Sequence, residues 1–336
     1  MVYLHEDREQ FLQALRLTYK QTRQMMQIIE KDYYVTVLLK LLAEKIPFIV
    51  FKGGTSLSKC HKVIRRFSED IDLTIDVSLS QGQKKKVKKA ILDSAEELGM
   101  VIENVDETRS RRDYNRYVVA YDSVLASSSS VVKSAVLLET SYTAVSFPTV
   151  LLPVYSYVGD MMQHEAPEFI DTFGLAPFMM KVQGVDRTLV DKVFAVCDYY
   201  LSGKVAKHSR HLYDIYKLLP LVSQDDTFKD LIKEVREVRA QSSICFSALP
   251  NVDVSGLLKE IIKENVYRND YENLTIQLLE ENISYDIAIE SLKKLAESKF
   301  FGRLQVQVEQ NLSSNYISGI HLIKKSVEQF IRSVVA

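Results

Sequence analysis

Cysteine and tryptophan are scarce in this sequence: its 336 residues include three cysteines and no tryptophan. The cysteines lie far apart in the chain, at Cys60, Cys197 and Cys245, and form no CxxC pair. This spacing excludes a disulfide framework and the paired cysteines of a structural zinc site. We therefore expect free thiols in a reducing compartment, the cytoplasm.

Long apolar runs are also absent, as is an excess of charge of either sign. No apolar stretch approaches the ~18 residues of a membrane-spanning helix, and the charged, amphipathic N-terminus does not resemble a signal peptide. We expect no contact with a membrane. Lysine and arginine number 43 against 44 aspartates and glutamates, a net charge of −1. Nucleic acid could therefore be bound only by a local basic patch.

The most informative segment is residues 48–76, FIVFKGGTSLSKCHKVIRRFSEDIDLTID. Its apolar start, Phe48–Phe51, predicts a short buried strand. A glycine-rich tight turn follows at Gly53–Ser56, and Leu57–Arg66 predicts a short helix. The end, Asp70–Asp76, alternates acidic or polar residues with apolar ones, which is typical of a strand with one solvent-facing side.

The acidic strand and the glycine turn together indicate a chemistry. A strand directs Asp70 and Asp72 to one face, roughly 7 Å apart at Cα. Paired carboxylates suit a hard cation such as Mg²⁺ that also binds substrate phosphates. Backbone N–H groups and hydroxyls that suit a phosphate come from Gly53, Gly54, Thr55 and Ser56. We interpret the combination as a two-metal nucleotidyl-transfer site; a glycine turn before an acidic edge strand is the purely structural alternative.

The joined motifs resemble a known family. Lys52–Leu57 (KGGTSL), followed by Arg66–Leu73 (RFSEDIDL), is similar to the DNA polymerase β superfamily of nucleotidyltransferases. Within it, the string resembles the AbiEii/AbiGii toxins of type IV toxin–antitoxin and abortive-infection (phage-defence) systems. The resemblance implies a metal-dependent toxin that transfers NMP from an NTP, with Mg²⁺ or Mn²⁺ as cofactor and a cognate antitoxin as partner. Because some relatives extend the tRNA acceptor end, it makes the tRNA 3′ end the first-choice acceptor.

The resemblance also assigns residues in the second half of the chain. The match is at Lys192, Arg210 and Asp214. It implies that Lys192, with Arg66, neutralises the triphosphate, and that Asp214 orients the lysine, holds the nucleotide or takes the acceptor's proton. A Lys192–Asp214 salt bridge without chemistry is the alternative. Relatives often have aspartate where this chain has His211, and we expect His208 and His211 to be surface or loop residues.

Other charged residues each have two interpretations. Glu139, the lone acid of an apolar strand, either joins Asp70 and Asp72 as a third metal ligand or faces solvent. The five lysines of Lys84–Lys89 form either a solvated helix face or a patch for RNA phosphates. Arginines and tyrosines interleave further on, which indicates either a surface for unstacked bases or ordinary sheet packing. They are Arg109, Arg111, Arg112, Tyr114, Arg116, Tyr117 and Tyr121. For Glu30–Tyr33, similar to the EKD(Y/W) string of the family, we expect the charges to be structural or solvent-facing rather than catalytic.

The predicted fold is α/β (α+β): a polymerase-β-type nucleotidyltransferase core with a small mixed sheet, then a mostly helical half. Two helices are expected over 6–45, with a break near 30–33. Further strands are expected at 100–102, 114–121, 134–142 and 178–183, with a flexible link at 127–130. Helical periodicity recurs at 186–201, 210–219, 228–238, 254–266, 285–295 and 320–335. We expect two domains, 1–185 with the nucleotidyltransferase core and 186–336 completing the active-site cleft.

Two other functions are consistent with the sequence. The same chemistry could modify a protein hydroxyl or a small molecule such as an antibiotic. A catalytically silent nucleotide-binding protein is the second alternative, and the intact glycine turn, acidic pair and Lys192/Asp214 match argue against it. No P-loop or protein-kinase signature is present.

Overall fold

The structure is a computed structural model that describes residues 2–68, 70–125 and 132–302. The link expected at 127–130 and the helix expected at 320–335 lie outside the described residues. All of these described residues belong to one compact unit.

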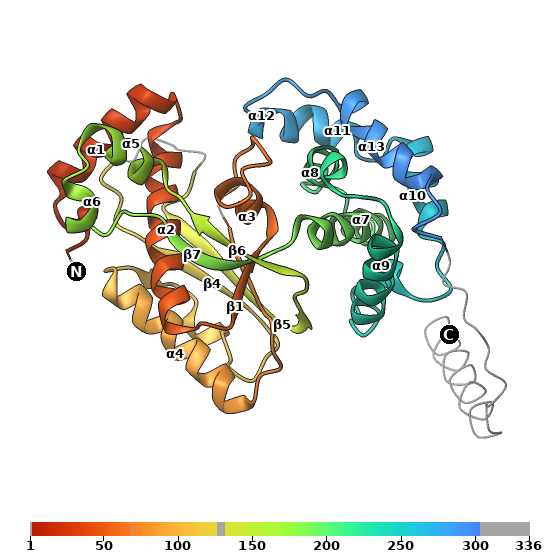
Figure 1. Ribbon diagram of the computed structural model, residues 1–336, viewed down its shortest axis with the longest axis horizontal. Helices are drawn as coiled ribbons and strands as arrows, with labels where there is room; N and C mark the ends of the chain where they lie inside the picture. The colour runs from red at the N-terminus through yellow and green to blue at the C-terminus, as the bar shows by residue number, and fades with distance from the viewer. Residues whose placement is uncertain (1, 69, 126–131, 303–336) are drawn as a thin grey trace, which may run out of the picture. The chain divides into compact units, whose positions relative to one another are not determined.

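The predicted mixed sheet is confirmed, and it has seven strands in the order β3-β4-β5-β2-β1-β7-β6 (Figure 1). Strand β2 is antiparallel to β1 and parallel to β5, and β1 is parallel to β7. The acidic strand is β2, which is central in the sheet, so the edge-strand alternative is wrong. The bounds are β1 Ile49–Lys52, β2 Ile71–Ile75, β3 Val101–Ile102, β4 Tyr114–Ala120, β5 Ala135–Val145, β6 Thr149–Val154 and β7 Phe178–Gln183.

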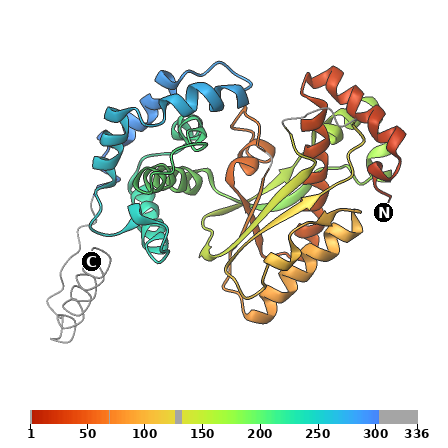
Figure 2. The ribbon, with the colours of Figure 1, turned by 180° about the vertical axis from the view of Figure 1, so that it is seen from behind.

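The helices of the first half start where the sequence supplies caps. Asp7 accepts hydrogen bonds from the backbone N–H groups of the first turn of α1, and Ser80 and Gln83 form a capping box at α4. Helix α2 passes in front of the sheet in Figure 1 and behind the strands in Figure 2, so it covers one face. The bounds are η1 Leu4–Glu6, α1 Arg8–Thr22, α2 Met26–Lys45, α3 Gly53–Lys59, α4 Gln81–Glu97, η2 Val105–Glu107, α5 Tyr157–Glu165 and α6 Phe169–Thr172.

Three boundaries differ from the sequence-based predictions. The break between the first two helices lies at Arg23, whose φ of 61° ends α1, while 30–33 is inside α2. The helix expected over 57–66 starts earlier and ends at Lys59, because the glycine turn is itself the first helical turn. Lys62, with φ 55°, lies in the segment that follows. The edge strand β6 was missed because Pro148 before it and Pro153 within it resembled irregular chain.

The second half is helical, as predicted. Up to residue 302, the longest helix of this half is α7, which begins directly after β7 and buries one side of every turn. The bounds are α7 Val185–Leu201, α8 Arg210–Leu218, η3 Leu219–Leu221, α9 Asp226–Arg239, η4 Phe246–Ala248, α10 Val254–Glu264, α11 Arg268–Asp270, the π-helix η5 Tyr271–Thr275, α12 Ile276–Leu278 and α13 Tyr285–Glu297. Across the described ranges, no helix combines the length and apolar character needed to cross a membrane.

Buried apolar residues form two clusters. One joins the sheet to α1, α2, α4 and α5, and the other joins α7–α10 and α13. Leu57 of α3 and Ile64 belong to the second cluster, so the segment between β1 and β2 packs against the helical half. A domain boundary at 185/186 stays a prediction, and the two clusters are consistent with it.

Candidate functional site

Four charged residues lie side by side across the sheet. The register pairs Lys52 of β1 with Asp72 of β2, Asp72 with Glu139 of β5, and Glu139 with Arg116 of β4. Residues directly opposite one another share a face of the sheet, so the two carboxylates are neighbours with a cation on either side. Arg116 Nε is 3.6 Å from Glu139 Oε1. The two outer cations stabilise the adjacent carboxylates of Asp72 and Glu139 on this face.

The glycine turn is pressed against this row. Gly53 has a φ of +80°, and a Cβ added there would lie 2.0 Å from Asp72 Oδ2. A Cβ on Gly54 would lie 2.5 Å from a terminal nitrogen of the Arg66 guanidinium and 2.8 Å from Ser68 Oγ. The missing side chains therefore let the start of α3 approach both the acidic strand and Arg66, which explains why glycine occupies both positions.

The hydroxyls of this turn are used within the protein. Thr55 Oγ1 is hydrogen-bonded to Ser68 Oγ at 2.9 Å, and Ser56 Oγ donates to the Gly53 carbonyl at 2.9 Å. Both side chains are buried. A phosphate at this turn would meet backbone N–H groups in the first place, with Thr55 and Ser56 acting mainly to fix the turn.

A buried charge cluster joins the sheet segment to the helical half. Asp214 of α8 accepts hydrogen bonds from Arg66 Nε at 2.7 Å and from its terminal nitrogen at 2.9 Å, and its Oδ2 lies 2.9 Å from Lys192 Nζ of α7. Asp214 is 0% exposed. Burial alone would raise the pKa of Asp214, but Arg66 and Lys192 hold it well below its usual range. Asp214 is thus a permanent anion that fixes two cations.

Of the two cations in this cluster, Lys192 loses its proton more readily than Arg66. Burial lowers the pKa of Lys192, Asp214 raises it and Arg66 lowers it again, and the net direction is downward. For Arg66, burial opposes the charge, but Asp214, and after it Tyr213 and Asp70, raise its pKa. Asp70 itself lies directly before β2, and its charge acts on the Arg66 side of the glycine turn.

His211 is not a surface residue, so that prediction is wrong. It lies on α8 with its side chain largely buried, and its Nδ1 is 3.3 Å from Lys192 Nζ. Burial, followed by the charge of Lys192, lowers the pKa of His211 well below its ordinary value, so the imidazole is neutral. His211 follows the buried face of α8 because it is one helical turn before Asp214, a spacing that the sequence offered as a signal.

Tyr199 is a site residue that the sequence analysis missed. Its ring stacks on His208 at a centroid distance of 3.5 Å and lies 5.7 Å from the ring of His211, nearly parallel to both. Burial raises its pKa, and the charges of Glu139 and Asp72 contribute to the shift. Through His211, which contacts Lys192, Tyr199 lies beside the buried charge cluster. The available signal was its place two helical turns after Lys192.

The predicted metal ligands have suitable donor atoms, but they are not gathered into one metal-binding site. Asp72 and Glu139 are neighbours on β2 and β5, and carboxylate oxygens are the donors that Mg²⁺ prefers. Gly53 leaves room beside Asp72 Oδ2. Among the residues described here, no group of three or more His, Cys, Asp or Glu side chains is arranged to hold a metal ion. Ligation by Asp70, Asp72 and Glu139 stays a prediction.

The basic clusters are mostly engaged locally. Lys84 pairs with Asp113, and Lys89 pairs with Asp93 at 2.7 Å on the surface. In the second cluster Tyr117 and Tyr121 are buried in the core, so they offer no face to a base. The interpretation as an RNA surface is wrong for these two rings. The exposed members include Tyr114, 52% exposed, which lies against Glu139.

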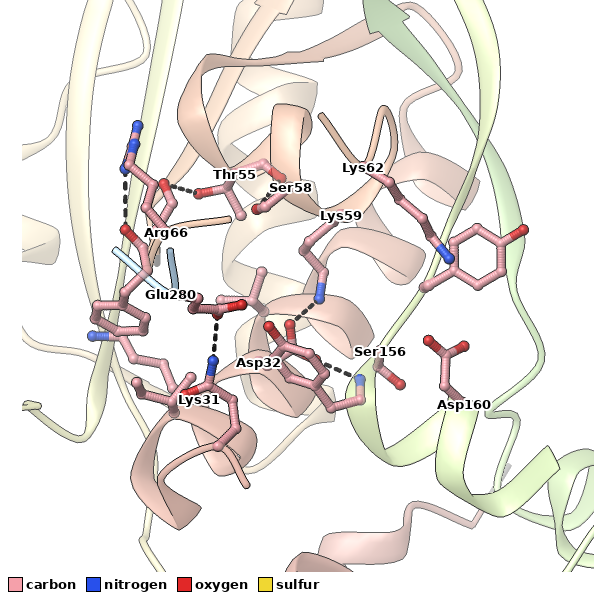
Figure 3. A pocket seen from close by; sticks show the side chains of 17 residues that line it. Lys31, Asp32, Thr55, Ser58, Lys59, Lys62, Arg66, Ser156, Asp160 and Glu280 are labelled. Atoms are coloured by element: carbon pink, nitrogen blue, oxygen red, sulfur yellow. Dashed lines mark hydrogen bonds and ion pairs between the residues drawn. The ribbon is translucent and has the colours of Figure 1, made fainter. Parts of the chain in front are cut away.

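A cavity of about 240 Å³ lies between α2, α3 and the start of α5 (Figure 3). It borders the site through Thr55 and Arg66, but none of the five predicted carboxylate and lysine residues of the reaction lines it. Lys59 pairs with Asp32, which also accepts from the backbone N–H of Tyr157 at 2.9 Å. Asp32 is thus engaged within the fold, consistent with the structural role expected for Glu30–Tyr33.

Comparison with known proteins agrees with this geometry. A family model described as nucleotidyl transferase AbiEii toxin, type IV toxin–antitoxin system, matches residues 38–297. No curated protein matches the chain. Among solved structures, the nucleotidyltransferase toxin MenT4 from Mycobacterium tuberculosis H37Rv is similar over 91% of this chain and 91% of its own, with a TM-score of 0.51 and 15% sequence identity. At this identity the likeness shows the fold alone.

Proposed function

The chain belongs to the AbiEii family of nucleotidyltransferase toxins of type IV toxin–antitoxin systems, and on that premise we propose that it transfers a nucleoside monophosphate from an NTP to the 3′ end of tRNA. The observation that carries the proposal is the Arg66–Asp214–Lys192 cluster. It connects helices α7 and α8 to the glycine turn, and the glycine turn touches Asp72. The cations that we assign to the triphosphate and the carboxylate Asp72 that we assign to a metal belong to one continuous set of contacts.

The reaction is an in-line displacement at the α-phosphorus. The acceptor hydroxyl oxygen forms a bond to the α-phosphorus, the bond to the bridging oxygen breaks, pyrophosphate leaves and the hydroxyl proton is released. Asp70, Asp72 and Glu139 would hold Mg²⁺ or Mn²⁺, and the bound metal would supply positive charge at the reacting phosphate. The backbone N–H groups of Gly53 and Gly54 bind phosphate oxygens.

The helical half supplies positive charge. Lys192 binds the triphosphate as a point charge, and Arg66 acts beside it. Among the three roles open to Asp214, the orienting role is supported by its two oxygens, which are both occupied by Arg66 and Lys192. An anion so paired, with a strongly lowered pKa, is a poor proton acceptor.

The biological role follows from the family. Modification of the tRNA end would stop aminoacylation, so the protein would arrest growth in the cytoplasm until a cognate antitoxin counteracts it. Abortive infection, in which arrest limits phage, is the setting we propose.

A different acceptor is favoured by one observation. The lysines and arginines expected to contact RNA are partly engaged, as Lys84 is with Asp113 and Arg109 and Arg112 are with backbone carbonyls. A protein hydroxyl or a small molecule would need no such patch. The same active site would serve, so the difference lies in the acceptor.

The test is label transfer from each of four α-³²P-labelled NTPs, with Mg²⁺, into total tRNA, into cell protein and into small molecules. The control is Asp72→Asn, purified in the same way. Label on tRNA from one NTP, lost in the control, is the expected result. Label on protein or on a small molecule would show that this molecule, and not tRNA, is the acceptor. If folded protein binds nucleotide but transfers no label, the protein is a catalytically silent nucleotide-binding protein.

A further inference from the structure

A groove of about 930 Å³ runs between the edge strand β6 and helix α9. We propose that this β6–α9 groove binds an extended segment of a partner protein in which apolar and basic side chains alternate. None of the residues assigned to nucleotidyl transfer lines it, so the inference does not rest on the proposed function.

The groove offers an apolar surface to its occupant. Val150 of β6 is 41% exposed and Leu221 is 53% exposed, and both line the groove. Leu152, Val222 and Leu231 add partly buried apolar surface. Apolar area that stays exposed on a soluble protein in a concave site is typical of an interaction surface.

The walls carry negative charge that the groove itself does not balance. Asp186, Asp225, Asp230 and Glu234 line it, and no lysine or arginine is among the lining residues that the structure describes. Arg187, next in the chain to the lining residue Asp186, is buried against the Phe147 ring and donates to the Phe147 carbonyl and to Asp191. A segment that fills the groove therefore gains from positive side chains.

The strand along the groove indicates an extended occupant. β6 is the terminal strand of the sheet. Gly184 N donates to the Pro148 carbonyl, so the backbone of Pro148 faces β7. In an antiparallel pair every second residue directs its N–H and C=O groups to the partner strand. The N–H and C=O groups of Thr149 and Leu151 therefore point away from β7. These groups can pair with an added strand, and side chains alternate on that strand so that every second one reaches the groove. Pro153 limits the pairing at one end.

The test is fluorescence polarisation of the full chain with a labelled eight-residue amidated peptide of alternating lysine and valine. The matched peptide has glutamate in place of lysine. We expect the lysine peptide to bind at least about tenfold more tightly, and binding to weaken as salt rises.

Variants of the protein locate the binding. Asp230→Lys/Glu234→Lys should weaken the lysine peptide by at least about tenfold, whereas Glu260→Lys, an exposed helical residue outside the groove, should leave it unchanged. Melting temperatures verify that the variants are folded. Equal binding of the glutamate peptide, or equal effects of the two substitutions, would overturn the proposal.

Hydrogen exchange distinguishes addition of the peptide as a strand to β6 from non-specific binding of the peptide. The lysine peptide should slow exchange of the Thr149 and Leu151 amides, and Leu221→Ser should weaken binding. Charge-dependent binding that leaves the exchange of both amides unchanged would also overturn the proposal, since no strand would have been added.

Discussion

Replacing Asp214 by asparagine would leave two buried cations without their shared anion. Asparagine keeps the size of the side chain, but Arg66 and Lys192 lose the carboxylate that each contacts within 3 Å. Removing one partner of a buried ion pair costs ~3–5 kcal/mol, because the remaining charge stays desolvated. With two cations left, we expect Asp214→Asn to lower the free energy of unfolding at pH 7 by about 3–5 kcal/mol or more.

The pH dependence of this loss has a defined sign. The folded pKa of Asp214 is depressed, so its contribution is fully present above its unfolded pKa of ~3.9 and is lost as pH falls through the folded value. The pKa of Lys192 is also depressed, and loss of Asp214 removes a group that raises it. A lysine with a depressed pKa stabilises the fold increasingly as pH rises towards its unfolded pKa of ~10.4. The difference in free energy of unfolding between the wild type and Asp214→Asn should therefore shrink between pH 7 and pH 10.

Urea unfolding followed by circular dichroism measures the loss. Asp113→Asn is the control, because Asp113 forms a half-exposed ion pair with Lys84 that is worth at most about 1 kcal/mol. Lys192→Met should cost less than Asp214→Asn, since the Arg66–Asp214 pair survives. A loss below about 1 kcal/mol for Asp214→Asn, or a larger loss for Lys192→Met, would refute the reasoning.

Three further predictions concern the reaction. Gly53→Ala should reduce transfer by about a hundredfold, because its Cβ would displace Asp72; retained transfer would show that the contact is dispensable. His211→Asp should shift the alkaline limb of the pH–rate profile upward by raising the pKa of Lys192, whereas neutral His211→Asn should not; identical profiles would rule out this coupling. EDTA should abolish transfer, and Mg²⁺ or Mn²⁺ should restore it. Full activity in EDTA would show that the reaction needs no metal bound by the predicted ligands.

The local patterns of the sequence predicted the part of the site that is contiguous in the chain. The apolar run, the glycine turn and the alternating strand at 70–76 became β1, the start of α3 and β2, because each pattern is set by neighbouring residues. The side chains of Lys192 and Asp214 are in contact, and their roles in the reaction stay a prediction. The family resemblance, rather than periodicity, made that pairing predictable.

What the sequence did not predict depends on contacts between distant residues. His211 was expected at the surface because a histidine near a basic loop gives no sign of the Lys192 ammonium beside it. Tyr199 resembled an ordinary helical tyrosine in the sequence, but packing stacks its ring against His208 and His211. Glu30 was expected at a helix break, but it is buried inside α2 because Ser123 and Val124 donate hydrogen bonds to it from another part of the chain.

The contribution of the helical half to catalysis is tested most directly by kinetics of Lys192→Met with NTP as the varied substrate. Lys217→Met is the matched control, since Lys217 forms a partly buried ion pair with Glu281 at 3.0 Å in the same half. We predict that Lys192→Met lowers kcat/KM for the NTP by at least about a hundredfold, while Lys217→Met stays within about threefold of the wild type. Similar values for the two variants would contradict an active site built from both the sheet and α7.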